Sequence, residues 1–149
     1  MTRAEAWCVH AAGALVGGTG LVYGWMRYFA EPADPFSLVN HPAEPLWHSA
    51  HIVFAPLLVF ACALVWRDHV WARFRSRSRT RRRTGLVLAA TLGPMIASGY
   101  LLQVSVEECW RTTWLAVHLA TSLVWLPCYV GHHTLAHTHR PLTDSEVPH

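Results

Sequence analysis

The chain has 149 residues, of which 52% are hydrophobic and only 14% are charged, with a formal net charge of +3. In an average soluble domain about a quarter of all residues are charged, so this composition argues against a soluble globular protein and against a disordered one. The length suffices for one domain, and the polar residues are concentrated in a few short stretches between apolar segments.

Four apolar segments predict four membrane-spanning helices within a single domain that covers residues 1–149. The predicted helices cover residues 4–29, 46–66, 85–104 and 113–133. Each is close to the roughly 20 residues that an α-helix needs to cross a bilayer, and each is too long for a strand. The first does not have the pattern of a cleavable signal peptide, because only Arg3 precedes a long apolar run. The predicted fold is an all-α, up-down four-helix bundle integral to the membrane.

An arginine-rich loop sets the predicted orientation. All twelve basic residues are arginine, and eight of them lie between positions 67 and 83. A basic run between two apolar segments is typical of a cytoplasmic loop and not of a nucleic-acid-binding face. The loop 67–84 is therefore predicted to be cytoplasmic. Both termini, including the polar tail 134–149, would then be cytoplasmic too.

Tryptophans and glycines add to the membrane interpretation. Tryptophans near the predicted segment ends, as in interfacial belts, are Trp7, Trp25, Trp47, Trp66, Trp110 and Trp114. Glycines spaced by three or four on the first predicted helix are Gly13, Gly17, Gly20 and Gly24. This small-residue face predicts close helix packing, or alternatively room for a flat cofactor, and it would permit an oligomer.

Histidines inside the apolar segments carry the functional argument, because ionisable residues in a membrane segment are costly. His10 lies in the first segment, His48 and His51 in the second, and His118 and His132 in the fourth, with His133 beside the last. His118 and His132 are fourteen residues apart, which is about 21 Å along a helix with an offset of about 40° around it. Both are therefore expected on one helix face.

Depth matching predicts two histidine pairs. His51 and His118 lie near the outer ends of two helices that run in the same direction, and His10 lies at the depth of His132 near the inner surface. Two facing imidazoles can hold a haem iron from both axial sides. A zinc site would need four converging ligands. The four cysteines form no CxxC pair and no CxxCH motif, which excludes a zinc ribbon and a c-type haem.

This arrangement of histidines over residues 4–133 resembles the di-haem b-type membrane cytochromes. Within this family, the pattern resembles that of the four-helix cytochrome b subunits of formate dehydrogenases and nickel–iron hydrogenases, a cytochrome b561-like group. The resemblance implies two b haems, with His10 and His132 as axial iron ligands at the cytoplasmic side and His51 and His118 at the periplasmic side. His48 and His133 are the alternative ligands, because each lies close to a preferred one.

The resemblance also implies a role and partners. The chain would be a non-catalytic electron-transfer subunit of an oxidoreductase complex in a bacterial inner membrane. Its partners would be membrane lipid, a quinone and a periplasmic or membrane redox protein. Residues near the predicted cytoplasmic haem that would face the quinone are His133, His137 and His139. Residues that would hydrogen-bond haem propionates or ligating imidazoles, or alternatively form hydrogen bonds between helices, are Ser98, Tyr100, Gln103 and Thr121.

Two alternatives stay open. The pair His48 and His51, with the C-terminal histidines, faintly resembles the histidine boxes of membrane desaturases and hydroxylases, but the predicted topology places the two groups on opposite sides of the membrane. The second alternative is a membrane anchor subunit without a cofactor, which leaves the buried histidines unexplained. No internal repeat is evident along the chain.

Overall fold

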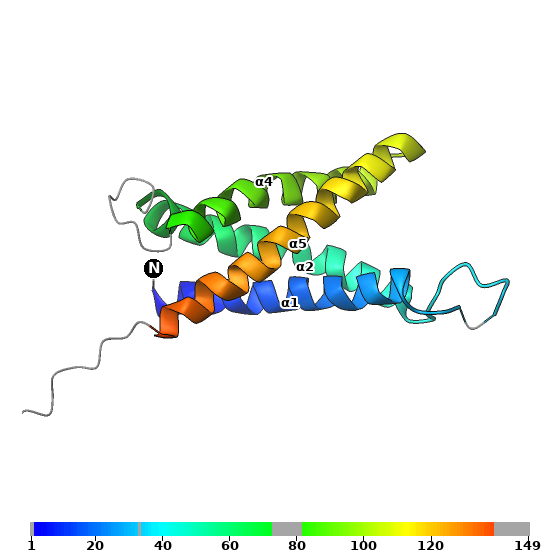
Figure 1. Ribbon diagram of the computed structural model, residues 1–149, viewed down its shortest axis with the longest axis horizontal. Coiled ribbons are helices and arrows are strands. Elements are labelled where there is room, and N and C mark those ends of the chain that lie inside the picture. The colour runs from blue at the N-terminus through cyan, green and yellow to red at the C-terminus, as the bar shows by residue number, and fades with distance from the viewer. Residues whose placement is uncertain (1, 33, 73–81, 139–149) are drawn as a thin grey trace, which may run out of the picture. The chain divides into compact units, whose positions relative to one another are not determined.

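The computed structural model describes residues 2–32, 34–72 and 82–138, and these residues are helical except for short connections. The elements are α1 (Arg3–Tyr28), α2 (Glu44–Val65), η1 (Trp66–Trp71), α4 (Arg82–Val104) and α5 (Glu108–Thr138) (Figure 1). No strand occurs in this described part of the chain, which confirms the all-α class. The helices form two hairpins, α1 with α2 and η1, and α4 with α5.

Helix α1 begins with a complete capping box. The Thr2 hydroxyl accepts from the Glu5 backbone N–H at 3.2 Å, and the Glu5 carboxylate accepts from the Thr2 N–H at 2.8 Å. These bonds satisfy two amides that the helix itself leaves without acceptors. The helix ends at Tyr28, one residue before the predicted end.

Helices α1 and α2 pack along seams that repeat about every seven residues. Buried residues of α2 include Glu44, Leu58 and Val65, which lie in one heptad series with the half-buried His51. The buried positions of α1 include Ala12, Thr19 and Met26, again at intervals of seven. A heptad repeat keeps the same side chains facing the partner helix when two helices supercoil gently. His51 therefore faces α1.

The segment after α2 is more ordered than the predicted loop. The helix continues into η1, a six-residue π-helix from Trp66 to Trp71, before the described part of this hairpin ends at position 72. The arginine-rich stretch at 73–81 lies outside the described residues. Helix α4 starts at Arg82, three residues before the predicted start.

The second hairpin has a shorter connection and a longer last helix than predicted. Only residues 105–107 separate α4 from α5, whereas the sequence predicts a turn over 105–112. Helix α5 has 31 residues and extends five residues beyond the predicted segment at each end. Its first turn holds Glu108, whose negative charge favours a helix N-terminus. Apolarity delimits the membrane span, but the helix continues into polar sequence.

Four helices are long and apolar enough to cross a membrane. Their spans are Arg3–Tyr28, Glu44–Val65, Arg83–Val104 and Glu108–Thr134. Large apolar side chains cover the outside of these helices, among them Leu57, Phe60 and Leu123. Such surfaces are expected where lipid and not water is the neighbour. The chain is therefore a candidate multi-pass membrane protein.

Candidate functional site

The imidazole of His51 on α2 rests against α1. Its Nδ1 lies 3.0 Å from the carbonyl oxygen of Val16 and 3.3 Å from the hydroxyl oxygen of Thr19. A carbonyl oxygen can only accept, so Nδ1 carries the proton and donates it. The lone pair of the neutral ring is then on Nε2. The Thr19 hydroxyl donates to the carbonyl of Leu15 at 2.7 Å, which orients its oxygen as a further acceptor.

Gly20 makes room for this ring. A Cβ atom at position 20 would lie 2.8 Å from Cε1 and 3.1 Å from Nδ1 of His51. Real Cβ contacts essentially never fall below 3.0 Å, so any side chain here would displace the imidazole. The glycine is therefore required for close approach of the ring to the α1 backbone.

His118 on α5 has the same surroundings against α4. Its Nδ1 lies 3.0 Å from the Met95 carbonyl oxygen and 3.4 Å from the Ser98 hydroxyl oxygen. Ser98 is fully buried and donates to the Pro94 carbonyl at 2.7 Å. The carbonyl again requires a proton on Nδ1 and places the ring lone pair on Nε2. Histidines that ligate metals commonly have their second nitrogen bonded in this way.

Gly99 completes the parallel between the two hairpins. A Cβ atom at position 99 would lie 3.2 Å from Cε1 of His118, a contact tighter than nine in ten real ones. In each hairpin the carbonyl residue is followed by a hydroxyl residue three positions later and by glycine at the next position. The two histidines also each follow a tryptophan by four positions, Trp47 and Trp114. The structure thus contains a repeated histidine environment that the sequence patterns did not predict.

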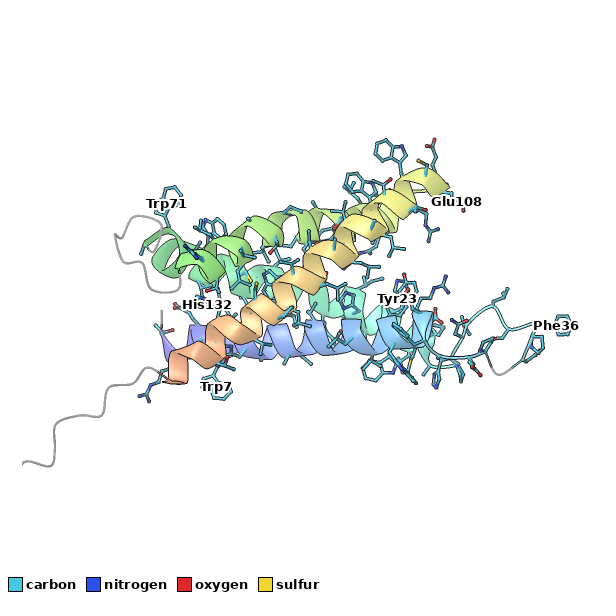
Figure 2. All side chains as sticks on the ribbon, viewed as in Figure 1. Trp7, Tyr23, Phe36, Trp71, Glu108 and His132 are labelled. Carbon is cyan, nitrogen blue, oxygen red and sulfur yellow. The ribbon has the colours of Figure 1, made fainter. Side chains whose placement is uncertain are left out.

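His132 lies near the other end of α5 (Figure 2) and has a related environment. Its Nδ1 lies 2.8 Å from the hydroxyl oxygen of Thr84, in the first turn of α4. A Cβ atom on Gly85 would lie 3.9 Å from Cε1 of His132, which is an ordinary van der Waals distance. A hydroxyl can donate or accept, so this contact orients the ring and allows either tautomer.

The alternative ligand His48 lies in a different environment from His51. Its exposed ring stacks on Tyr23, with ring centroids 4.8 Å apart and an interplanar angle of 28°. Tyr23 lies towards the C-terminal end of α1 (Figure 2). Aromatic stacking holds His48 at the surface of the hairpin, whereas the Nδ1–H bond orients His51. The two histidines are therefore held in different ways, His51 by a hydrogen bond to the α1 backbone and His48 by stacking on Tyr23.

The remaining predicted histidines lie on α1 and at the C-terminal end of the chain. His10 on α1 and His133 on α5 are half-buried. His137 is within the last turn of α5, and its side chain, like all of His139, lies outside what the structure describes. Each predicted haem pair takes one histidine from each hairpin, so the pairing stays a prediction. The structure places three histidines, His51, His118 and His132, each in contact with the helix next to its own.

Three of the four predicted hydrogen-bonding residues divide into two groups, and the fourth, Tyr100, is exposed on α4. Ser98 lies beside His118 Nδ1, as expected for a residue that supports an imidazole. Thr121 instead donates to the Val117 carbonyl of its own helix at 2.7 Å, and the Gln103 amide donates to the Gly99 carbonyl at 3.3 Å. These two side chains satisfy backbone carbonyls of their own helices.

A histidine-box enzyme would need several converging ligands. Within residues 2–32, 34–72 and 82–138, no three side chains of His, Cys, Asp or Glu come together in a group that could hold a metal ion. His51, His118 and His132 are instead each held singly against a helix.

Comparisons with known proteins found no match: no family model, no curated protein and no solved structure is significantly similar to this chain.

Proposed function

We propose that this chain is a membrane cytochrome that transfers electrons across a bacterial inner membrane through two b-type haems. The observation that carries the proposal is the Nδ1–H donation of His51 and His118 to backbone carbonyls. Ligating histidines generally have this second bond, because it fixes the tautomer and raises the basicity of the coordinating nitrogen. If these histidines only joined the two helices of each hairpin, nothing would require the same Nδ1 arrangement in both hairpins.

Four histidines would hold the two groups. His51 and His118 would hold the iron of the periplasmic-side haem, and His10 and His132 that of the cytoplasmic-side haem. A b-type haem held by these histidines would supply reversible one-electron transfer. Backbone carbonyls orient the imidazoles of His51 and His118 and fix the proton of each on Nδ1, and the Thr84 hydroxyl orients His132.

Helix α5 is suited to link the two sides of the membrane. It is one continuous helix over Glu108–Thr138, and His118 and His132 lie about 21 Å apart along it. In a helix packed along a heptad seam, fourteen residues correspond to four turns of 3.5 residues. Both histidines then fall on the seam that faces α4, where Ser98 and Thr84 contact them.

Equal depth of His51 and His118 is supported by the tryptophans. Trp47 and Trp114 each precede their histidine by four residues, about 6 Å along a helix. Tryptophan prefers the membrane interface, so the two histidines would lie at one level below it. With the arginine-rich loop in the cytoplasm, this level is the periplasmic side, the four helices form an up-down bundle, and both termini are cytoplasmic.

The partners follow from the same proposal. A quinone in the membrane would exchange electrons with the cytoplasmic-side haem, near His133, and a redox protein would exchange them at the other side. The glycine-containing face of α1 would allow close contact with another helix, including that of a second copy.

The test is a reduced-minus-oxidised spectrum of the purified full chain, with haem quantified as its pyridine complex. The proposal expects b-type absorption and about two haems per chain. His51→Leu and His118→Leu should each reduce the content to about one haem, whereas the matched control His48→Leu should retain two.

Three outcomes would overturn this assignment. Two haems in His118→Leu would remove that residue as a ligand. Bound zinc or non-haem iron in place of haem would favour a histidine-box enzyme. A chain that folds, assembles in the membrane and takes up no haem would be an anchor subunit.

A further inference from the structure

The sequence contains only three dipeptides in which serine or threonine precedes glycine: Thr19–Gly20, Thr84–Gly85 and Ser98–Gly99. In each of the three, the hydroxyl oxygen lies 2.8–3.4 Å from Nδ1 of a histidine on the neighbouring helix, and a Cβ atom added to the glycine would lie 2.8–3.9 Å from Cε1 of the same ring. All three histidines belong to the four proposed haem ligands. Every serine–glycine or threonine–glycine dipeptide in the sequence therefore lies against a proposed haem ligand.

We infer that these dipeptides are histidine seats, which fix the position of each imidazole ring before any haem binds. In a seat, the hydroxyl residue contacts Nδ1 and the glycine lets the ring lie against the helix backbone. Nε2 is then the coordinating atom, and the seat residues are positioning residues. The inference rests on the proposed function only in naming haem iron as what Nε2 binds.

The three seats differ in how tightly they hold the ring. A Cβ atom added to the glycine would approach Cε1 of the histidine to 2.8 Å at Gly20, 3.2 Å at Gly99 and 3.9 Å at Gly85. The first two histidines also donate to a carbonyl at 3.0 Å, from Val16 and Met95. The seats of the periplasmic-side pair are therefore tight, and that of His132 is loose.

This gradation permits an experiment with internal controls. The variants are Gly20→Ala, Gly99→Ala and Gly85→Ala in the full-length chain. Gly18→Ala and Gly93→Ala are matched controls, because both positions are exposed and neither added Cβ has a described atom within 4 Å. All five variants replace glycine by alanine, so the change in helix propensity is the same in each.

The first readout needs no haem. The chain is made with ¹⁵N-labelled histidine in a host that cannot synthesise haem, and its ring nitrogens are observed by solid-state NMR in bilayers. His51 and His118, assigned by their removal, should have the proton on Nδ1. Gly20→Ala should shift the His51 signals strongly, and Gly99→Ala should shift the His118 signals by a smaller amount. Gly85→Ala and the two controls should leave the His51 and His118 signals unchanged.

The second readout uses the haem-loaded chain. A displaced ring changes the relative orientation of the two axial imidazoles, which alters the electron paramagnetic resonance of a low-spin haem. Gly20→Ala should change the signal of one haem and leave the other as in the wild type. Weakening the Nδ1 bond lowers the basicity of Nε2, so the reduction potential of the same haem should rise.

A second pair of variants guards against a simple folding defect at Gly20. Thr19→Val removes the hydroxyl oxygen beside His51 Nδ1, and Thr19→Ser restores it. The seat expects a changed haem signal and potential in Thr19→Val, with recovery in Thr19→Ser.

The inference and the proposed function fail in different ways. Nδ1 protonation and the graded glycine effects in a chain that never binds haem would keep the seats and remove the cytochrome. Two haems with identical signals in Gly20→Ala, Gly18→Ala and the wild type would keep the cytochrome and overturn the seats. A proton on Nε2 of His51 in the haem-free chain would also overturn them.

Discussion

The ion pair between α1 and α2 gives a prediction whose magnitude follows from the structure. The Glu44 carboxylate is nearly buried and accepts from Arg27 Nη1 at 3.1 Å and from the backbone N–H of Asn40 at 3.2 Å. It also lies in the first turn of α2, where a negative charge is favourable. Glu44→Ala removes all three interactions.

The expected cost of Glu44→Ala is about 3 kcal/mol. A hydrogen bond to a charged group contributes about 1.5–3 kcal/mol, and the helix-terminus effect adds about 0.3–1 kcal/mol. The Arg27 side chain is 47% exposed, so water replaces part of what it loses. Glu44→Gln keeps an oxygen that the Asn40 N–H can donate to, and should cost about 1 kcal/mol.

Denaturant unfolding of the full chain in detergent, followed by tryptophan fluorescence, measures both values. Glu31→Ala, an exposed carboxylate in the same connection, is the matched control and should change the free energy of unfolding by less than about 0.5 kcal/mol. If Glu44→Ala is as stable as this control, the carboxylate does not join the two helices as described. If Glu44→Gln is as unstable as Glu44→Ala, the bond from Asn40 does not contribute.

Three further predictions concern the second hairpin and the topology. Ser98→Ala should lower the free energy of unfolding in detergent by only about 0.6 kcal/mol, the average for polar contacts in membrane helices. Ser98→Leu should lower it by about 1–3 kcal/mol, because the site is fully buried, and equal values for the two variants would contradict that burial. A double-mutant cycle of Thr84→Val with His132→Phe should give a coupling of about 0.6 kcal/mol, and a coupling near zero would mean that the 2.8 Å contact does not stabilise the hairpin. In single-cysteine variants, a membrane-impermeant maleimide added to sealed cells should label the exposed Cys109 and not Cys8, and the reverse result would invert the proposed topology.

The sequence predicted the helices well because membrane spans depend on length and apolarity, which are local properties. The ends of α1 were predicted within one residue. Helix α5 was predicted less well, since Glu108 and the polar residues after position 133 continue the helix beyond the apolar segment. Hydropathy ends where the lipid ends, whereas backbone hydrogen bonding continues for as long as the sequence allows.

The sequence singled out the candidate histidines but, of the residues that the structure places beside them, only Ser98. His51, His118 and His132 were found because histidine is rare in apolar segments. Thr19 and Gly20 were not identified as their neighbours, for two reasons. A threonine in a helix usually bonds its own backbone, as Thr19 does with Leu15, and the sequence does not tell Gly20 from its exposed neighbour Gly18. Only the pairing of two helices distinguishes them.

The antiparallel register explains why one hairpin has two seats and the other has one. Thr84 lies fourteen residues before Ser98 on α4, and His132 lies fourteen residues after His118 on α5. Because both helices rise by the same distance per residue and run antiparallel, the two steps end side by side, and Thr84 contacts His132 as Ser98 contacts His118.

The same step in the first hairpin leads from Thr19 to Glu5 and from His51 to Val65. Glu5 belongs to the capping box of α1, and Val65 is a buried apolar residue at the end of α2. No second seat forms there, and the other proposed haem ligand of this hairpin, His10, is on its first helix. Under the proposed function, two tight seats therefore hold the periplasmic-side haem. The proposed cytoplasmic-side haem would instead be held by one loose seat and by His10 from α1, so seat variants should affect the two haems unequally.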